Sequence, residues 1–346
     1  MSDEATYIHE IREREINYDW MRVFAMSMVI LNHIADWYLL RMAEPSRLVY
    51  LCEGLSHCAI PLFLMLTGAF VVDKAAKETP KIFYLKSLKK LGIPFLIFIF
   101  MYYAYDLYNK NITWENALKG FITGFHGLYS HWYVVMLAVV YAFLPLAGLI
   151  KKNVNLKAYQ KGVVVFFVWV MAGHYFESAD VVWSLANMYF FGYVLFGNVL
   201  KEKLHGIKNN VYGNFLVMLG MGILVINHSF FLYGKVINGG DYFDKLLNLY
   251  GAPFIILSSV IIFVGFSLLT IKKEISMISE LSYLIFLCHK LFIDIMGRNF
   301  WEQIENFFEG KLYYIIPVEW ILIFTISLLF SMFLNWILKM TVYKML

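Results

Sequence analysis

The feature that most constrains this chain is a series of ten apolar segments, each long enough, or nearly so, to cross the roughly 30 Å core of a lipid bilayer. They cover residues 20–40, 49–72, 88–108, 131–150, 161–177, 183–200, 211–233, 249–271, 279–297 and 313–338. A segment surrounded by lipid has no water to satisfy its backbone, so it folds as a helix. The sequence therefore predicts an all-α, polytopic membrane bundle. The fifth and sixth segments are short, which leaves eight spans as the alternative count.

The composition agrees with a membrane location. Hydrophobic residues make up 60% of the 346 residues, whereas soluble domains contain about 45–50%. Residues 1–18 are strongly charged and lack the apolar core of a signal peptide, so they are predicted to form a cytoplasmic juxtamembrane segment. Because there is no long linker and no internal repeat, residues 1–346 are predicted to form a single integral-membrane domain.

The distribution of basic residues predicts the orientation in the membrane. If the N-terminus is cytoplasmic and all ten segments cross, the inner connections contain 19 lysines and arginines and the outer connections contain eight. Cytoplasmic loops of membrane proteins carry such an excess of positive charge. A wrong number of spans would reverse the later loops, so both ends of the chain are predicted to lie in the cytoplasm.

Two ionisable residues lie within the first apolar segment. Arg22 and His33 are eleven residues apart. At about 100° and 1.5 Å per residue, they share one face of a helix and lie roughly 16 Å apart along its axis. Ionisable side chains inside a span usually face the interior of the bundle or a wet cavity. We therefore expect this face to line a passage that begins at Arg22, near the cytoplasmic surface, and reaches His33 at depth.

Such a passage suits an acyl-coenzyme A donor. The phosphates of the donor would bind at a basic entrance formed by Arg22 together with Lys86, Lys89 and Lys90, at the start of the third segment. The thioester would be carried inward on a flexible arm whose length is comparable to the spacing between Arg22 and His33. His33 would then act as a general base toward a hydroxyl group or accept the acyl group itself.

Each of these residues also has a purely structural interpretation. Arg22 could extend to the lipid headgroups and anchor the helix. The three lysines could serve only to set the topology. His33 could be an ordinary histidine of the bundle interior with its hydrogen bonds satisfied.

Five short motifs follow one another along the chain. The first motif is Asp19-x-x-Arg22 followed by His33, and the second is Pro61-Leu-Phe-Leu-Met-Leu-Thr67-Gly68. The other three are Lys86-Ser-Leu-Lys89-Lys90 before Pro94, His131-Trp132-Tyr133, and Ser282-Tyr283 followed by His289. Together they resemble the motifs of acyltransferase family 3, the integral-membrane O-acyltransferases. The third motif departs from that family, which has arginines there. Lysine keeps the charge but lacks the bidentate geometry of arginine.

The resemblance covers nearly the whole chain and implies a ten-helix O-acyltransferase. It is strongest to the branch that acetylates bacterial surface polysaccharides. That branch implies acetyl-CoA as donor, a surface glycan or its lipid-linked precursor as acceptor, and a location in the bacterial inner (cytoplasmic) membrane. By the same resemblance, His33, Arg22 and Asp19 are the catalytic candidates, and the donor-binding candidates are Arg22, Lys86, Lys89 and Lys90.

Four further residues are candidates for binding the acceptor: Glu53, His57, Trp132 and His289. Glu53 and His57 are four residues apart on one helix and can touch, so they either line the acceptor entrance or form a structural pair. His289 either contributes to the site or forms a hydrogen bond to a neighbouring helix as a structural contact.

A transporter or flippase for a lipid-linked sugar or a small metabolite is the alternative function. Ten spans with arginine, histidine and glutamate inside the membrane would suit such a carrier as well. Many transporters are built from two matching halves with interrupted helices, and no such halves are visible in this sequence.

The cysteines point away from metal or disulfide chemistry. Cys52, Cys58 and Cys288 lie in apolar segments without metal-ligand spacing, so we expect buried free thiols. No metal cofactor and no nucleic-acid partner is expected. The expected partners are the acyl donor, the glycan acceptor and membrane lipids.

Overall fold

The computed structural model describes residues 15–42, 46–109, 113–116, 132–173, 188–238 and 250–341. These ranges are helical and contain no β-strand, which confirms the predicted all-α bundle. The helices are α1 (Ile16–Leu39), α2 (Arg47–Ser56), α3 (Ala59–Lys77), α4 (Pro80–Ser87), the π-helix η1 (Leu88–Gly92), α5 (Ile93–Tyr108), α7 (Trp132–Asn153), α8 (Leu156–Gly173), α10 (Met188–Leu204), α11 (Asn210–Asn238), α13 (Pro253–Leu268), α14 (Ser276–Asn299), α15 (Trp301–Phe307) and α16 (Leu312–Thr341). The predicted juxtamembrane segment lies mostly outside the described residues.

Each of the ten apolar segments coincides with one of these helices or with consecutive ones, at least over its described part. Six helices of the described chain are long and apolar enough to cross a membrane: Arg47–Lys77, Pro80–Tyr108, Trp132–Asn153, Asn210–Leu232, Ser276–Asn299 and Leu312–Thr341. Helix α1 is not among them, because its polar residues lower its hydropathy. The chain is therefore a multi-pass membrane protein, and the number of ten spans stays a prediction.

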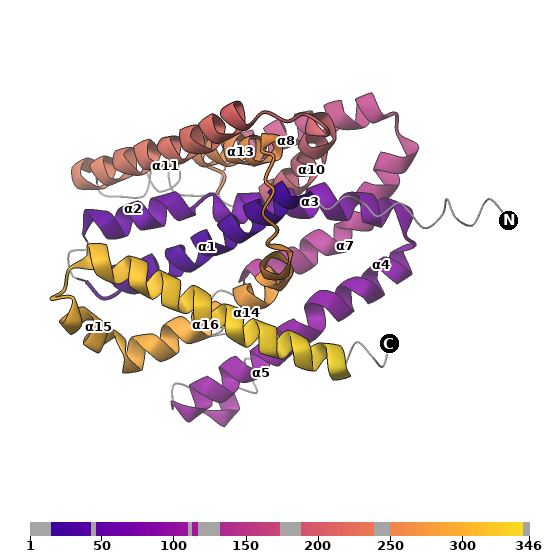
Figure 1. Cartoon of the computed structure of the whole chain (residues 1–346). Helices are drawn as coiled ribbons and strands as arrows, with labels where there is room; N and C mark the ends of the chain where they lie inside the picture. Colours follow the sequence, from indigo (N-terminus) through magenta and orange to yellow (C-terminus); the bar gives the residue numbers. More distant parts are fainter. Residues whose placement is uncertain are drawn as a thin grey trace.

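The helices alternate in direction. In Figure 1, α1 runs from right to left and α16 runs from left to right, and the two helices are in contact. Helix α3 ends and α4 begins at the right-hand side of the same view, whereas α15 lies at the left. This is the arrangement that successive crossings of a membrane produce.

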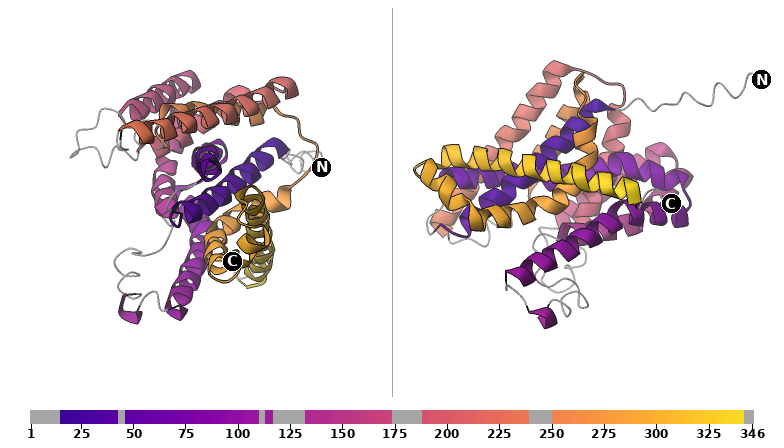
Figure 2. Two further views of the ribbon diagram at one scale, coloured as in Figure 1. Left: turned by 90° about the vertical axis from the view of Figure 1, so that its left-hand side faces the viewer. Right: turned by 60° about the horizontal axis from the view of Figure 1, so that its bottom comes forward.

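Helix α1 forms the centre of the bundle. It packs against α2, α3, α13, α14 and α16, and Figure 2 (left) shows it with α11 on one side and α14 and α16 on the other. Side chains of α1 such as Met21, Ala25 and Ile30 are fully buried, whereas α11 and α16 expose large apolar side chains such as Phe215 and Trp336. An apolar outer surface is stable in lipid. Among the polar residues of α1, Asn17 and Asp19 are buried, whereas Arg22, His33 and Asp36 are partly exposed.

Helices α3 and α10 approach each other closely at two glycines. A Cβ atom on Gly68 would overlap the carbonyl oxygen of Val194, and one on Gly197 would overlap the backbone of Met65. Small residues allow membrane helices to pack backbone against backbone in this way. Gly68, the last residue of the second motif, therefore has a packing role.

A network of polar residues joins the ends of α3, α7 and α10. Lys151 of α7 forms ion pairs with Asp73 of α3 and with Glu202 of α10, the latter at 2.5 Å. Its Nζ also donates a hydrogen bond to Oδ1 of Asn198 at 2.9 Å. The side chain of Lys151 is largely buried, and its positive charge offsets the cost of removing the two carboxylates from water.

Two spans contain irregular turns. The span Arg47–Lys77 is interrupted at His57 and Cys58, where α2 ends and α3 begins. The span Pro80–Tyr108 passes through the π-helix η1, which carries Lys89 and Lys90. Such irregularities are frequent at functional sites. The first of them borders the cavity at His33.

Candidate active site

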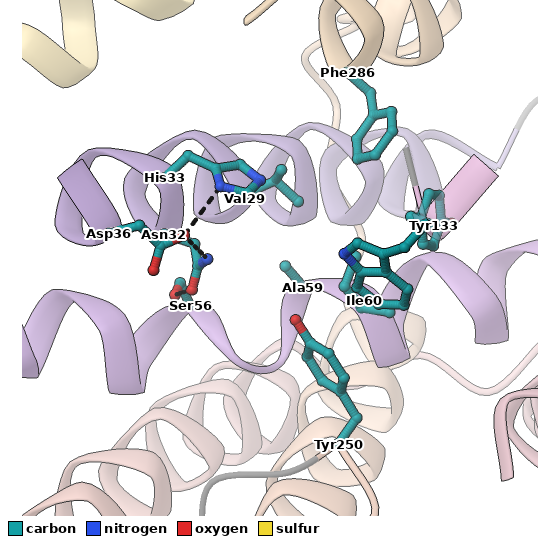
Figure 3. A pocket seen from close by; sticks show the side chains of 11 residues that line it. Val29, Asn32, His33, Asp36, Ser56, Ala59, Ile60, Tyr133, Tyr250 and Phe286 are labelled. Atoms are coloured by element: carbon teal, nitrogen blue, oxygen red, sulfur yellow. Dashed lines mark hydrogen bonds and ion pairs between the residues drawn. The ribbon is translucent and has the colours of Figure 1, made fainter. Parts of the chain in front are cut away.

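A cavity of about 140 Å³ surrounds His33. It is lined by Val29, Asn32, His33, Asp36, Ser56, Ala59, Ile60, Trp132, Tyr133, Tyr250 and Phe286. Figure 3 shows a polar side, with His33, Asp36, Asn32 and Ser56, and an apolar and aromatic side opposite. A cavity of about 150 Å³ holds a molecule the size of benzene. The space at His33 therefore admits an acyl group or one reacting arm of a substrate, but not a whole sugar together with a donor.

His33 is held by a carboxylate on its own helix. Its Nδ1 lies 3.0 Å from Oδ2 of Asp36, and the same oxygen accepts a hydrogen bond from Nδ2 of Asn32 at 3.0 Å. An ionised carboxylate can only accept hydrogen bonds. In a neutral His33 beside an ionised Asp36, Nδ1 would therefore carry the proton, and Nε2, on the far side of the ring, would present a lone pair.

The polar chain extends from α1 to α2. Oγ of Ser56 donates a hydrogen bond to Oδ1 of Asn32 at 2.7 Å and also lies 2.6 Å from the carbonyl oxygen of Glu53. Sequence reasoning did not single out Asp36, Asn32 or Ser56 as site residues. The spacing of Asp36, three residues after His33, is a local signal that could have identified it. Ser56 comes from another helix, and no sequence signal points to it.

His289 of α14 packs against the ring of His33. The two ring centres are 5.2 Å apart with an angle of 31° between the ring planes. Nδ1 of His289 lies 2.7 Å from the carbonyl oxygen of Phe286 and 3.2 Å from that of Ile285, whereas its buried Nε2 has no hydrogen-bond partner among the described residues. Phe286 lines the cavity and His289 does not. The ring of His289 thus contacts that of His33 outside the lining of the cavity, and its role in binding the acceptor stays a prediction.

Of the four residues predicted to bind the acceptor, Trp132 alone lines the cavity. Its indole is 46% exposed and lies 5.9 Å from the ring of Tyr250, with the planes 28° apart. His57 is buried at the break between α2 and α3, with its ring 6.0 Å from that of Tyr250. Glu53 is half-buried on α2. His131, the first residue of the fourth motif, lies outside the described residues.

Arg22 and Asp19 form a fixed cluster with α14. Nη1 of Arg22 donates hydrogen bonds to Oδ1 of Asp19 at 3.1 Å and to Oγ of Ser279 at 2.7 Å. Oγ of Ser279 in turn donates to Oδ1 of Asp19 at 2.5 Å. The guanidinium therefore points into the bundle. Arg22 is not among the residues that line the cavity, so a continuous passage from Arg22 to His33 stays a prediction.

The three lysines of the third motif occupy different environments. Lys86 is 54% exposed and forms an ion pair with Glu78 at 2.7 Å. Lys90 of η1 lies within electrostatic range of Arg22, Lys74 and Glu280. Lys89 is half-buried on the same turn. The structure thus brings Lys90 toward Arg22 and pairs Lys86 with a glutamate elsewhere on the surface.

The cysteines are buried free thiols, as predicted. Within the described ranges, no group of three or more His, Cys, Asp or Glu side chains is arranged to hold a metal ion.

Comparison with known proteins gives one match. No curated protein and no solved structure is significantly similar to the chain. A family model described as an acyltransferase domain matches residues 15–340, which is nearly the whole chain and includes α1 and all the motifs described above. The chain belongs to the membrane acyltransferase family 3.

Proposed function

We propose that the protein transfers an acyl group, most simply acetyl, from acyl-CoA to a hydroxyl group of a surface polysaccharide or of its lipid-linked precursor. The family supports acyl transfer as the class of reaction. The observation that carries the assignment of the site is the contact between His33 and Asp36 at the edge of the cavity. The predicted orientation brings the donor from the cytoplasm and the acceptor from the outer side of the bacterial inner membrane.

In the direct route, His33 is a general base. Nε2 takes the proton of the acceptor hydroxyl as the oxygen attacks the carbonyl carbon of the thioester. The carbon–sulfur bond then breaks, and the thiolate takes the proton back from Nε2. Asp36 holds the ring and stabilises the imidazolium while it carries the proton.

In the relay route, His33 carries the acyl group. Nε2 forms a bond to the carbonyl carbon as the carbon–sulfur bond breaks, and the thiolate leaves. The acceptor hydroxyl then attacks the acyl-imidazole and releases His33. Over the two steps, the acceptor hydroxyl releases one proton and the CoA thiolate takes up one proton. The small cavity suits this route because donor and acceptor need not occupy it together.

The two substrates would bind at different parts of the bundle. Trp132 is an exposed residue that also lines the cavity, and its indole would contact a sugar ring of the acceptor. Arg22 and Lys90, near the predicted cytoplasmic end of α1, would bind phosphates of the donor. His289 would support the ring of His33 from behind.

The decisive experiment follows labelled acyl groups. Purified protein in lipid nanodiscs is incubated with radiolabelled acetyl-CoA and a glycan acceptor, and label is expected to move onto the glycan. The transfer should be lost in His33→Ala and retained in His205→Ala, a control at an exposed histidine. Transfer that survives in His33→Ala would overturn the assignment of the site. Uptake of a lipid-linked glycan into vesicles without acylation would indicate a carrier instead.

A second measurement separates the two routes. The protein is mixed with labelled donor alone, and His33 is analysed for an acid-labile label. A label on His33 that is discharged by later addition of acceptor supports the relay. Full turnover without any such label supports direct transfer.

A further inference from the structure

A second cation lies beside Arg22 that no sequence motif singles out. Nζ of Lys201, on α10, is 3.7 Å from the ring centre of Phe70, and Cζ of Arg22 is 5.7 Å from the same centre. The two positive charges are therefore within about 10 Å of each other, across one aromatic ring of α3. The side chain of Lys201 is only 11% exposed, so its charge is poorly screened by water.

The two cations have partners of different character. Asp19, which pairs with Arg22, is buried and is also held by Ser279. Glu15, which pairs with Lys201 at 2.5 Å, is 28% exposed and precedes the first turn of α1, where its side chain makes no capping hydrogen bond. Asp19 is thus a fixed part of the bundle, whereas the carboxylate of Glu15 can be displaced without breaking the helix.

A third cation approaches the same carboxylate. Lys208, in the connection between α10 and α11, lies within electrostatic range of Glu15, and its Nζ donates a hydrogen bond to the carbonyl oxygen of Ser267 at 3.0 Å. Glu15 therefore lies among cations from two other parts of the chain, at the N-terminal end of a 24-residue helix. That position favours a negative charge through the helix dipole.

We propose that Lys201, together with Arg22 and Lys208, forms a phosphate-binding site in which the carboxylate of Glu15 occupies the place of the ligand's phosphate. This inference rests on the proposed function, because the phosphates would be those of the acyl-CoA donor. Binding is then an exchange: a phosphate with higher charge and more acceptor oxygens displaces Glu15 from Lys201. Glu15 in turn keeps the buried lysine neutralised between turnovers.

The test measures binding of CoA without any transfer reaction. Wild-type protein, Lys201→Ala, Glu15→Gln and Lys203→Ala are placed in nanodiscs of phosphatidylcholine, and CoA binding is measured by isothermal titration calorimetry. Lys203, on the same helix, is exposed and serves as the matched control. Loss of one charge-assisted contact is expected to weaken binding about tenfold or more in Lys201→Ala. Removal of the competing carboxylate is expected to strengthen binding by up to about fivefold in Glu15→Gln.

The outcomes separate this inference from the function on which it rests. Absence of CoA binding to the wild type would contradict the proposed donor itself. Normal binding in wild type, Lys201→Ala and Glu15→Gln alike would overturn the site and leave the function standing. Glu15→Gln is a gain-of-affinity variant, so the test holds even if Lys201→Ala fails to fold.

A membrane lipid headgroup also carries a phosphate and could bind at the same site. A second experiment distinguishes lipid binding from CoA binding. The same variants are placed in nanodiscs that contain phosphatidylglycerol, and bound lipid is quantified after exchange into detergent. The assignment to the donor would be overturned if Lys201→Ala lost bound phosphatidylglycerol but bound CoA as the wild type does. CoA binding that depends on Lys201 in both kinds of nanodisc supports it.

Discussion

Oδ2 of Asp36 lies 3.0 Å from Nδ1 of His33, one turn further along the same helix. Because both residues belong to α1, the backbone of a single buried helix fixes their relative position. Asn32 and, through it, Ser56 of α2 add to this arrangement, and a carboxylate at this place selects which nitrogen of a neutral imidazole is free to react.

The first prediction concerns this carboxylate. Asp36→Asn replaces an acceptor by an amide that can donate to Nδ1, which favours the tautomer with the proton on Nε2. We expect kcat to fall by at least about 100-fold while KM for the donor changes little, as for other carboxylates that orient a catalytic histidine. Steady-state kinetics check this, with Asp36→Glu expected to recover part of the rate. An unchanged kcat would rule out the orienting role.

The second prediction concerns the aromatic wall of the cavity. Trp132→Ala removes the indole of an exposed residue that lines the cavity, and KM for the glycan is expected to rise roughly three- to tenfold, with a smaller rise in Trp132→Phe. KM for the acyl donor should not change. Trp114→Ala, at a highly exposed tryptophan, is the control. A change in KM for the donor instead of the glycan would contradict the acceptor assignment.

The third prediction concerns the contact between α3 and α10. Gly68→Ala places a methyl group against the carbonyl oxygen of Val194, so we expect a loss of stability of about 1–3 kcal/mol or more. Gly222→Ala, at a glycine of α11 with open space around it, should be stabilising by about 0.5–1 kcal/mol. Thermal unfolding of the detergent-solubilised protein measures both. Equal melting temperatures for the two variants would refute the close packing.

The fourth prediction concerns the polar network on α7. Lys151→Met leaves Asp73 and Glu202 without their shared cation, and the expected cost is about 3–5 kcal/mol. Lys152→Met, at the exposed neighbouring position, should change stability by less than about 0.5 kcal/mol. The same unfolding assay applies. If the Lys151→Met protein were as stable as the Lys152→Met protein, the network would not contribute to the stability of the fold.

The parts of the fold that could be predicted from the sequence depend on residues close together along the chain. Apolar stretches predict helices because the backbone N–H and C=O groups of a segment in lipid have to form hydrogen bonds with each other. A helix is present at every predicted segment within the described residues. The pairing of Arg22 and His33 on one helix follows from residue spacing alone. The relation of His33 to Asp36 is equally local, although it was not identified from the sequence.

The parts that sequence reasoning missed depend on contacts between distant helices. Lys86 carries a family motif, but tertiary packing pairs it with Glu78. Lys201 lies beside Arg22 only because α3 and α10 pack backbone against backbone at Gly68 and Gly197. The ring of His289 contacts that of His33 because α14 packs against α1, and its predicted role in binding the acceptor stays a prediction. No residue pattern along one segment contains this information.

Helix α14 contacts both the Arg22 cluster and His33. Ser279, in its first turn, is hydrogen-bonded to Arg22 and Asp19, and the ring of His289, ten residues or about 15 Å further along, packs against that of His33. Because one continuous helix carries both contacts, we expect a ligand that draws the guanidinium away from Ser279 to change the support that His289 gives to His33 as well.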